Sequence, residues 1–334
     1  MNVKKALASF EAHVPLLATN RRYWFVRTDG GENYDSFKHG GYIAIGWNEI
    51  LLESIRKRRK DGSDLKLKIA KAYNYNLEDS NEKSSVTAIA TKLIRFTEEI
   101  KAGDVVIIPS ASSAYLSFGI VQETPVFIGK TNDGCLYSKR KRVKWRIEQP
   151  MAQLDPELYR MTASHHTISD VSAYDVFIDK EIKNLYRKGE DTHLIIPIGK
   201  EDVLGGYAFF SAWSELLELA QMIADEEGIE FNKNDVKARI RVQSPGDVEF
   251  IVMAVQGAFA LTLAIGALAG VQAGWKKGEF FIKTSGAIAA LNKYMNDRAK
   301  RKLINRISKN LDAINVDPAK LLDAFFDENK PDDE

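Results

Sequence analysis

The stretch that decides the fold reads "RRYWFVRTDGGENYDSFKHGGYIAIGWNEI" and covers residues 21–50. Its two apolar runs, 23–27 and 42–47, are rich in aromatic and β-branched residues, which favour β-strands. Two Gly-Gly pairs interrupt the segment between these runs. A simple hairpin needs a shorter turn. The glycines therefore raise the question of whether Trp24 and Trp47 only fill a core or line a binding pocket.

Strand and helix patterns continue through the first half of the chain. Three more strands are expected, at 105–109, 114–123 and 140–148, and the last alternates basic and apolar residues like a half-exposed strand. Helices are expected at 3–18, 49–60, 65–73 and 85–101. The sequence thus predicts an α+β fold with a small, mostly antiparallel β-barrel decorated with helices.

The second half of the chain changes in character after Pro150. A short strand at 192–199, a helix at 209–228 and a strand at 235–246 lead into the apolar run "IVMAVQGAFALTLAIGALAGV" at 251–271. We expect an α-helical C-terminal region there. The predicted parts of the chain are an N-terminal helix (1–20), a barrel domain with a helical tail (21–190), an α/β connector (191–246), an apolar and basic helical region (247–325) and an acidic tail (326–334).

Composition and charge restrict the classes of function. A chain of 334 residues is long enough for two or three domains, and its single cysteine, Cys135, excludes an intrachain disulfide. No signal peptide is recognised, so we expect a cytoplasmic location, with association with the inner membrane as an alternative. Residues 1–150 hold 25 Lys and Arg against 17 Asp and Glu, and the remainder holds 22 against 29. The basic half is the better candidate for binding a polyanion.

The apolar run at 251–271 contains only two polar residues, Gln256 and Thr262. As a helix it would be about 31 Å long, enough to cross a bilayer. Small residues at four-residue spacing would form a ridge that lets another helix approach closely. The ridge positions expected to mediate oligomerisation or membrane packing are Ala258, Thr262, Gly266, Gly270 and Gly274.

The charges that follow this run argue against a single crossing. The basic segment 292–309 would be exported, contrary to the tendency of Lys and Arg to remain inside. Three interpretations therefore stay open: a re-entrant or hairpin membrane segment, a span in an assembled effector, or a helix buried in a folded domain or oligomer.

Sequence patterns of known catalytic and cofactor sites are not found. The histidines and the one cysteine are not spaced as metal ligands, and there is no phosphate-binding loop or serine-hydrolase elbow. "GDVEF" (246–250) places two carboxylates at alternate positions, but no lysine follows at the spacing a metal-dependent nuclease would need. We therefore expect no catalytic residues, no metal site and no cofactor.

Three segments together carry a family resemblance: "YWFVRTDGGENYDSFKHGGYIAIGW", "IKAGDVVIIPSASSAYLSFGIVQE" and "RKRVKW". In their order of elements they resemble the PUA-like/EVE-like domain at the front of some predicted Mrr-type restriction endonucleases and related prokaryotic defence proteins. The likeness covers residues 21–185. Beyond residue 230 the chain departs from these enzymes, and its Ser-Pro-Gly turn before an apolar helix resembles apolar-helix modules of uncharacterised bacterial proteins.

The resemblance implies a compact barrel whose open mouth binds nucleic acid, in some members a flipped modified base. Such a base needs a stacking aromatic ring, a polar group for its Watson–Crick edge and cations for the flanking phosphates. Trp47, at a strand end beside Asn48, is the best pocket candidate among the tryptophans. The residues expected to supply the binding groups are Arg27, Tyr42, Trp47, Asn48, Ser110, Lys141, Lys144 and Trp145.

Two functions follow from these observations, and a third interpretation, an enzyme whose site has no recognised sequence pattern, stays open. The first is a prokaryotic, anti-phage defence protein whose barrel senses a nucleic acid or nucleotide, while its C-terminal helices form a homo-oligomer or engage a membrane as the effector. The second is a soluble nucleic-acid-binding module that recruits a separate nuclease.

Overall fold

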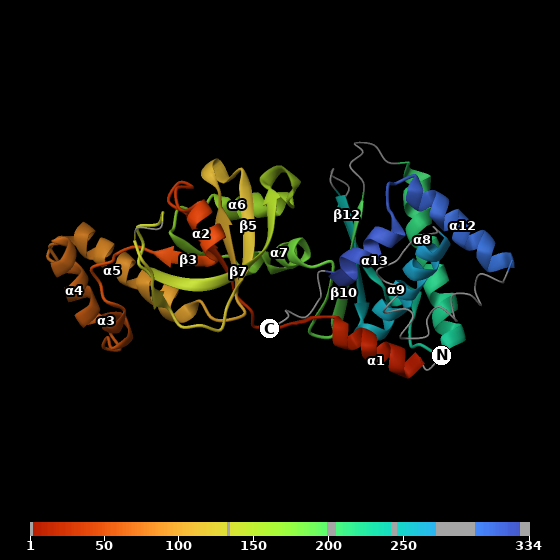
Figure 1. The fold of residues 1–334 in the computed structure, drawn as a ribbon, viewed down its shortest axis with the longest axis horizontal. Coiled ribbons are helices and arrows are strands. Elements are labelled where there is room, and N and C mark those ends of the chain that lie inside the picture. The colour runs from red at the N-terminus through yellow and green to blue at the C-terminus, as the bar shows by residue number, and fades with distance from the viewer. Residues whose placement is uncertain (1–2, 132–133, 199–204, 242–245, 272–297, 328–334) are drawn as a thin grey trace. The chain divides into compact units, whose positions relative to one another are not determined.

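The structure, a computed structural model, describes residues 3–131, 134–198, 205–241, 246–271 and 298–327. The chain divides into two units (Figure 1). The half-barrel unit consists of Asn20–Ile182, and the five-stranded unit combines Met1–Thr19 with Lys183–Glu334. These bounds differ from the predicted ones, in which the N-terminal helix (1–20) stands apart and the barrel domain extends to residue 190. Both units contain strands and helices, so the fold is mixed α/β.

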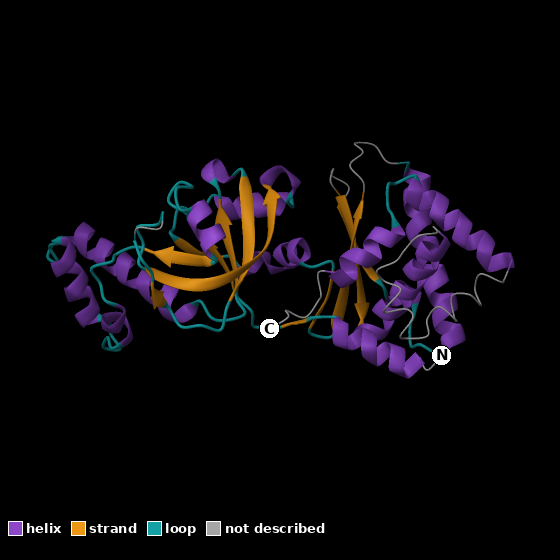
Figure 2. Cartoon of the chain, in the orientation of Figure 1, coloured by secondary structure: helices purple, strands orange, loops and turns teal. Residues whose placement is uncertain are grey.

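The half-barrel unit is built around a curled sheet (Figure 2). Its strand order is β3-β7-β5-β4-β2-β8, with β6 also paired to β7. Only β2 and β4 pair in parallel, and the other neighbours are antiparallel. The strands are β2 (Tyr23–Val26), β3 (Tyr42–Ile45), β4 (Val105–Pro109), β5 (Tyr115–Val121), β6 (Phe127–Ile128), β7 (Lys139–Pro150) and β8 (Ile168–Asp170).

Strands β2 and β4 are buried on both faces, which explains their uninterrupted apolar sequences. Alternate side chains enter two different cores: Trp24 and Val26 join the core inside the curl, and Tyr23 and Phe25 join the core on the other face. The two strands of the opening stretch do not pair with each other. β2 lies between β4 and β8, whereas β3 pairs with β7.

The curl of the sheet depends on a close approach between β5 and β7. Pairing shifts register between Phe118 and Gly119. A Cβ atom on Gly119 would lie 2.4 Å from Val143 Cγ1 and 2.6 Å from the Trp145 ring, so no larger residue fits without movement. This bulge lets one twelve-residue strand, β7, pair with β5 along its second half and with β3 along its first.

Helices cover both faces of the half-barrel sheet. The short helix after Gly30-Gly31 was not predicted, because the glycines around it mark a loop in sequence terms. The helices of this unit are α2 (Tyr34–Gly40), α3 (Leu52–Arg56), α4 (Ser63–Tyr73), α5 (Ser80–Ile94), a π-helical turn (Arg95–Glu99), α6 (Tyr159–Thr162) and α7 (Asp175–Ile182), with 3-10 turns at Ala111–Ser113, Met151–Gln153, Pro156–Leu158 and Ser172–Tyr174.

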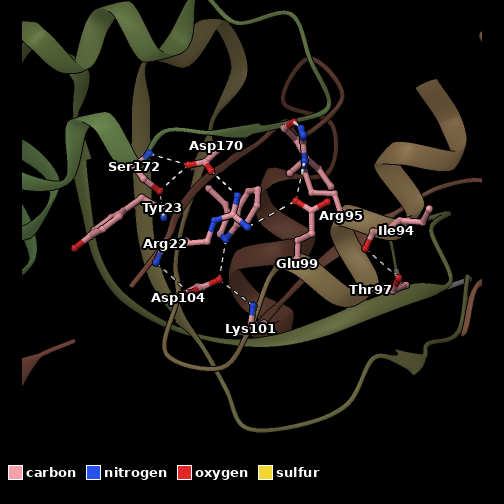
Figure 3. A network of polar contacts seen from close by, with 12 residues as sticks. Arg22, Tyr23, Ile94, Arg95, Thr97, Glu99, Lys101, Asp104, Asp170 and Ser172 are labelled. Carbon is pink, nitrogen blue, oxygen red and sulfur yellow. Dashed lines mark hydrogen bonds and ion pairs between the residues drawn. The ribbon is translucent and has the colours of Figure 1, made fainter. Parts of the chain in front are cut away.

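A polar network at the start of β2 joins three parts of this unit (Figure 3). Arg22 Nη2 lies 2.5 Å from Asp170 Oδ2 on β8, and Arg22 Nη1 lies 3.7 Å from Glu99 Oε2. Burial raises the pKa of Asp170, but hydrogen bonds from Ser172 and Arg22 outweigh it and hold the pKa below its usual value. The Arg22 guanidinium also lies 4.2 Å from the Trp24 ring centroid, a cation–π distance.

Asp104 is the buried centre of this region, with 6% of its surface exposed. Its Oδ2 accepts hydrogen bonds from Trp24 Nε1 (2.8 Å) and from the Lys101 amide (2.9 Å), and its Oδ1 accepts one from the Arg22 amide (3.2 Å). One carboxylate therefore ties β2 to the turn that begins β4.

Replacing Asp104 with Asn should loosen β2 and β4, because the amide group would point N–H donors at N–H donors. We expect a loss of about 2 kcal/mol in the local opening free energy, which is roughly 30-fold faster exchange of the strand amides. Hydrogen exchange of the full chain, read by mass spectrometry on β2 and β4 peptides, measures it. Asp35→Asn, at an exposed position, is the control and should stay within about 0.5 kcal/mol.

The five-stranded unit carries a sheet of order β1-β9-β10-β12-β11. β1 pairs with β9 in parallel, and this pairing places the N-terminal segment in the same unit as the end of the chain. The C-terminal region is therefore a mixed α/β unit and not a purely helical one. Its strands are β1 (Leu16–Leu17), β9 (Leu185–Lys188), β10 (Asp191–Ile198), β11 (Lys237–Arg241) and β12 (Gly246–Met253).

The described helices of this unit pack against one face of the sheet (Figure 2). That face carries Leu194 and Ile196 of β10 with Phe250 and Val252 of β12. The helices are α1 (Val3–His13), α8 (Gly206–Glu227), α9 (Ala254–Val271), α12 (Arg298–Asp312) and α13 (Pro318–Asp327), with a 3-10 turn at Lys233–Asp235.

The apolar run of the sequence forms the end of β12 and the central helix, α9. This helix contacts α1, α8, α12 and α13 as well as β10 and β12, and Phe259 lies 5.3 Å from Phe10 between ring centroids. Because neighbours surround it, the helix is apolar all round. In the part of the chain that the structure describes, no helix combines the length and apolarity that a membrane crossing requires.

The small-residue ridge lies mostly inside the five-stranded unit. Ala258, Thr262 and Gly266 are buried, and Thr262 Oγ1 donates to the Ala258 carbonyl at 2.8 Å. Gly270 is exposed, and Gly274 lies outside the described residues. The buried small residues thus serve close packing within one chain.

Replacing a small residue of the ridge with leucine should lower the unfolding free energy at one end of the ridge and leave it unchanged at the other. Ala258→Leu overpacks a fully buried site and should cost about 1–3 kcal/mol of unfolding free energy. Gly270→Leu places its side chain where a Cβ meets no atom of the described residues within 4 Å, so it should not lower stability. Urea unfolding of the full chain compares the two variants. Equal losses in both would contradict the burial described for α9.

Candidate nucleic-acid interface

The Trp47 turn, residues 47–50, follows β3 after one residue, Gly46. Trp47 has a φ of +57°, which is rare for a bulky residue and is often found at functional sites. Its carbonyl accepts hydrogen bonds from the Ile50 amide (3.1 Å) and from Lys139 Nζ (2.8 Å). The indole is partly buried, with Lys92 Nζ 5.5 Å from a ring centroid, close enough for a cation–π contact.

Two buried lysines of β7 support the turn and the sheet beside it. Lys139 and Lys141 are 1% and 6% exposed. Lys141 Nζ donates to the Ile100 carbonyl at 2.6 Å, at the C-terminal end of the π-helical turn, where a cation is favoured. Burial lowers the pKa of each lysine to about 8, against opposing contributions from Glu49 for Lys139 and Asp104 for Lys141. Lys141, predicted to contact phosphates, instead lies in the interior.

Asn48 is occupied by the neighbouring loop. Its Nδ2 donates to the Leu136 carbonyl at 2.7 Å, and its Oδ1 accepts from the Ser138 amide (3.0 Å) and hydroxyl (2.9 Å). Tyr137 of the same loop donates to Asp29 at 2.9 Å. Asn48 therefore holds the 136–138 segment against the Trp47 turn, which fixes the position of the turn.

A hollow of about 360 Å³, called the lysine hollow below, has a lining that begins with Glu49, two positions after Trp47 in the chain. Within it, Lys68 Nζ donates to Ser54 Oγ at 3.1 Å, and exposed Lys71 has no ion-pair partner among the described residues. Exposed Leu51 adds apolar surface. The residues that line the hollow are Glu49, Ile50, Leu51, Ser54, Lys68, Lys71 and Ala72.

The helices around the hollow are strongly basic. Residues 56–71 contain eight Lys and Arg and only two Asp. Glu98 pairs with Arg58, and Glu53 pairs with Lys57. Lys60 and Lys66 form no ion pair in the part of the chain described, whereas Arg59 lies near Asp61 and helps to lower the pKa of that carboxylate. The segment that supplies Lys68 and Lys71 to the hollow therefore carries eight positive charges against two negative ones.

The remaining predicted residues do not converge on this turn. The Arg27 guanidinium donates to the carbonyls of Thr162 (2.6 Å) and Ser164 (3.0 Å). Tyr42 is 4% exposed beneath the Arg140 guanidinium, and Ser110 Oγ accepts from the Tyr115 amide at 2.9 Å.

The other two predicted residues lie on β7. Trp145 is partly buried, and its Nε1 donates to the Phe37 carbonyl at 2.9 Å. Lys144, next to it in the chain, is exposed.

Three cations were not predicted from the sequence: Lys68 and Lys71, which line the lysine hollow, and Lys92, which contacts the Trp47 ring. Lys68 and Lys71 are three residues apart on α4, so they share one face of the helix. That spacing within a basic segment could have identified the surface. Lys92 lies on α5 and meets Trp47 only through the tertiary fold.

Comparisons with known proteins cover the half-barrel unit alone. Residues 24–172 match a family model described as "Domain of unknown function (DUF8426)". This match is less than half of the chain and lies wholly within Asn20–Ile182. No curated protein and no solved structure matches the sequence. The family match and the structural unit thus delimit nearly the same segment.

Proposed function

We propose that the half-barrel unit binds nucleic acid on the surface shared by the Trp47 turn and the lysine hollow. One observation carries the proposal: Trp47, whose indole is partly exposed, precedes by two positions in the chain the first residue that lines the lysine hollow. The lysines of that hollow have no carboxylate partner among the described residues. An aromatic face stacks on a base, and neighbouring cations bind the phosphates, which is the usual combination for single-stranded nucleic acid.

The hollow suits one nucleotide in size and charge. Its volume of about 360 Å³ lies at the lower end of the range for small-ligand sites. Lys68 and Lys71 supply two positive charges against the one negative charge of Glu49, and the Ser54 hydroxyl supplies a further polar group at its wall. The backbone of the turn is fixed by Lys139 and Asn48, so the indole is positioned before a ligand arrives.

The resemblance to PUA-like and EVE-like domains supports the same proposal. A barrel with an open mouth fits the curled sheet of this unit. The proposed contact differs from the set of binding residues expected from the sequence, because Tyr42 and Lys141 of that set are buried. We propose stacking on Trp47 alone, with phosphates bound by the α4 lysines.

For the whole chain we infer that it recruits a separate nuclease and is not itself a membrane-engaging effector. The apolar surface of α9 is already covered by helices and strands of its own unit. Ala258 and Thr262 are equally unavailable for contact with a second chain. The family resemblance supports a place in prokaryotic, anti-phage defence, and we assign the protein to the cytoplasm as part of this proposal.

Removing the two lysines of the hollow should weaken binding and its salt dependence together. The variant Lys68→Glu with Lys71→Glu should bind single-stranded DNA and RNA at least tenfold more weakly, and its log–log salt slope should fall by about 2. Fluorescence anisotropy across a salt series measures both quantities. Methylated and unmodified duplexes in the same series test preference for a modified base.

A matched control changes the same charge elsewhere on the unit. Lys83 and Lys130 are exposed, and neither side chain has a partner among the described residues, so Lys83→Glu with Lys130→Glu should reduce binding far less. Equal losses in the two double variants would show non-specific attraction and reject the proposed surface.

Stacking on Trp47 should be separable from these charge effects. Trp47→Leu keeps an apolar side chain against the core but removes the aromatic face, so affinity should fall about tenfold or more at every salt concentration. The salt slope should not change. If binding is unaffected while circular dichroism shows an intact fold, the indole is not part of the interface.

A further inference from the structure

A second cluster of charged side chains lies on the sheet of the five-stranded unit, on the face opposite its helices. His193 of β10 lies opposite Ile251 of β12, and Glu249 lies opposite Arg239 of β11. Glu249 Oε1 is 2.6 Å from His193 Nδ1, and its Oε2 accepts from Arg239 Nη1 at 3.1 Å. Three adjacent strands thus bring an imidazole, a carboxylate and a guanidinium together.

Glu249 is fully engaged by its two neighbours. It is 1% exposed, and each of its oxygens has one of these partners. Burial raises the pKa of Glu249, but the hydrogen bond from His193 and the charge of Arg239 outweigh it and keep the pKa below its usual value. The carboxylate is therefore ionised, and Nδ1 of His193 carries the proton that it accepts.

The imidazole is fixed in orientation. The Tyr186 ring stacks on His193 with a centroid distance of 4.6 Å and an angle of 8° between planes. With Nδ1 bound to Glu249, only Nε2 remains for another partner, and no hydrogen bond from the described residues reaches it. The Arg239 side chain is half exposed, and only one of its nitrogens is engaged by Glu249.

The arrangement suits an anion better than a metal ion. Both oxygens of Glu249 are taken, and no group of three or more possible ligand residues occurs among the described residues. Lys237, on the same strand and face as Arg239, adds a positive charge without an ion-pair partner there. A buried charge cluster contributes little net stability compared with apolar residues of the same volume, so stability alone does not account for it.

We propose that Arg239 and His193 bind a terminal phosphate group. The guanidinium fork of Arg239 donates hydrogen bonds to two phosphate oxygens. A third phosphate oxygen carries a proton and donates it in a hydrogen bond to Nε2 of His193. A terminal phosphate can carry that proton because its second pKa is about 6, whereas a phosphodiester cannot. The same chemistry is offered by a free nucleotide and by the phosphorylated end of a nucleic-acid strand. Glu249 and Tyr186 are positioning residues.

The test titrates the full chain with inorganic phosphate, adenosine monophosphate, and oligonucleotides with a 5′-phosphate or a 5′-hydroxyl. Binding is followed by the imidazole ¹⁵N and ¹H signals of His193, which His193→Gln identifies by their loss. We expect phosphate to shift these signals, and 5′-phosphorylated ligands to shift them while the 5′-hydroxyl strand does not. A larger response to the nucleotide or to the strand end identifies the source.

Arg239→Gln should weaken phosphate binding at least tenfold, and Arg239→Lys, which keeps the charge but not the fork, should give an intermediate loss. Glu249→Gln should change the tautomer signature of the His193 nitrogens before any phosphate is added. Arg301→Gln, at an exposed position of α12 with no ion pair to another described residue, is the charge control and should bind like the unaltered protein.

The proposal is overturned if the His193 signals of the folded protein do not respond to phosphate, or if Arg239→Gln responds as Arg301→Gln does. Arg239→Lys keeps the test decisive if Arg239→Gln fails to fold. The double lysine variant of the half-barrel unit should leave this response intact, so this site and the nucleic-acid surface fail or succeed separately.

Discussion

The half-barrel unit depends on one buried carboxylate. Asp104 lies where β4 begins, and it accepts hydrogen bonds from the Arg22 amide, the Lys101 amide and the Trp24 indole. β2 and β4 are the only parallel neighbours among the described strands of that sheet, and 78 residues lie between Val26 and Val105, including β3 and helices α2–α5. A parallel pair with such a long connection has no hairpin turn to set its register. The contacts of Asp104 set it instead, because a slip would leave a buried anion without its three donors.

This constraint explains which parts of the fold the sequence could reveal. The double-sided burial of β2 and β4 appears as unbroken apolar runs, and both strands were predicted. Helix α2 was not predicted, because the glycine pairs on either side of it indicate a loop and its own helical pattern is short. The union of the N-terminal helix with the end of the chain rests on the pairing of β1 with β9, which joins residues about 170 positions apart. Local patterns carry no information about such a pairing.

The candidate interface was predictable in part, because a local pattern shows the position of a residue in the chain but not its contacts in the fold. Trp47 stands at a strand end after a glycine, and this position alone suggested a pocket residue. The alternation along β7 indicated two faces but not which one points inward. Lys139 and Lys141 face inward, because their aliphatic stems pack in the core while their ammonium groups reach backbone carbonyls. A sequence pattern counts such lysines as surface charge, and only the fold shows that they position the turn.

The two proposed phosphate-binding surfaces use cations in physically different ways. The lysines of the hollow are exposed, so their attraction to a strand acts through water, falls with salt and differs little between sequences. Arg239 and His193 are held by a buried carboxylate, so their donors have fixed directions and select for the geometry and protonation of the bound group. In these proposals the first surface contributes affinity for any strand, and the second contributes a preference for a terminal phosphate. The two surfaces therefore differ in what they can select, because exposed lysines do not fix the direction of their donors, whereas one guanidinium and one imidazole held in place can bind a single phosphate group.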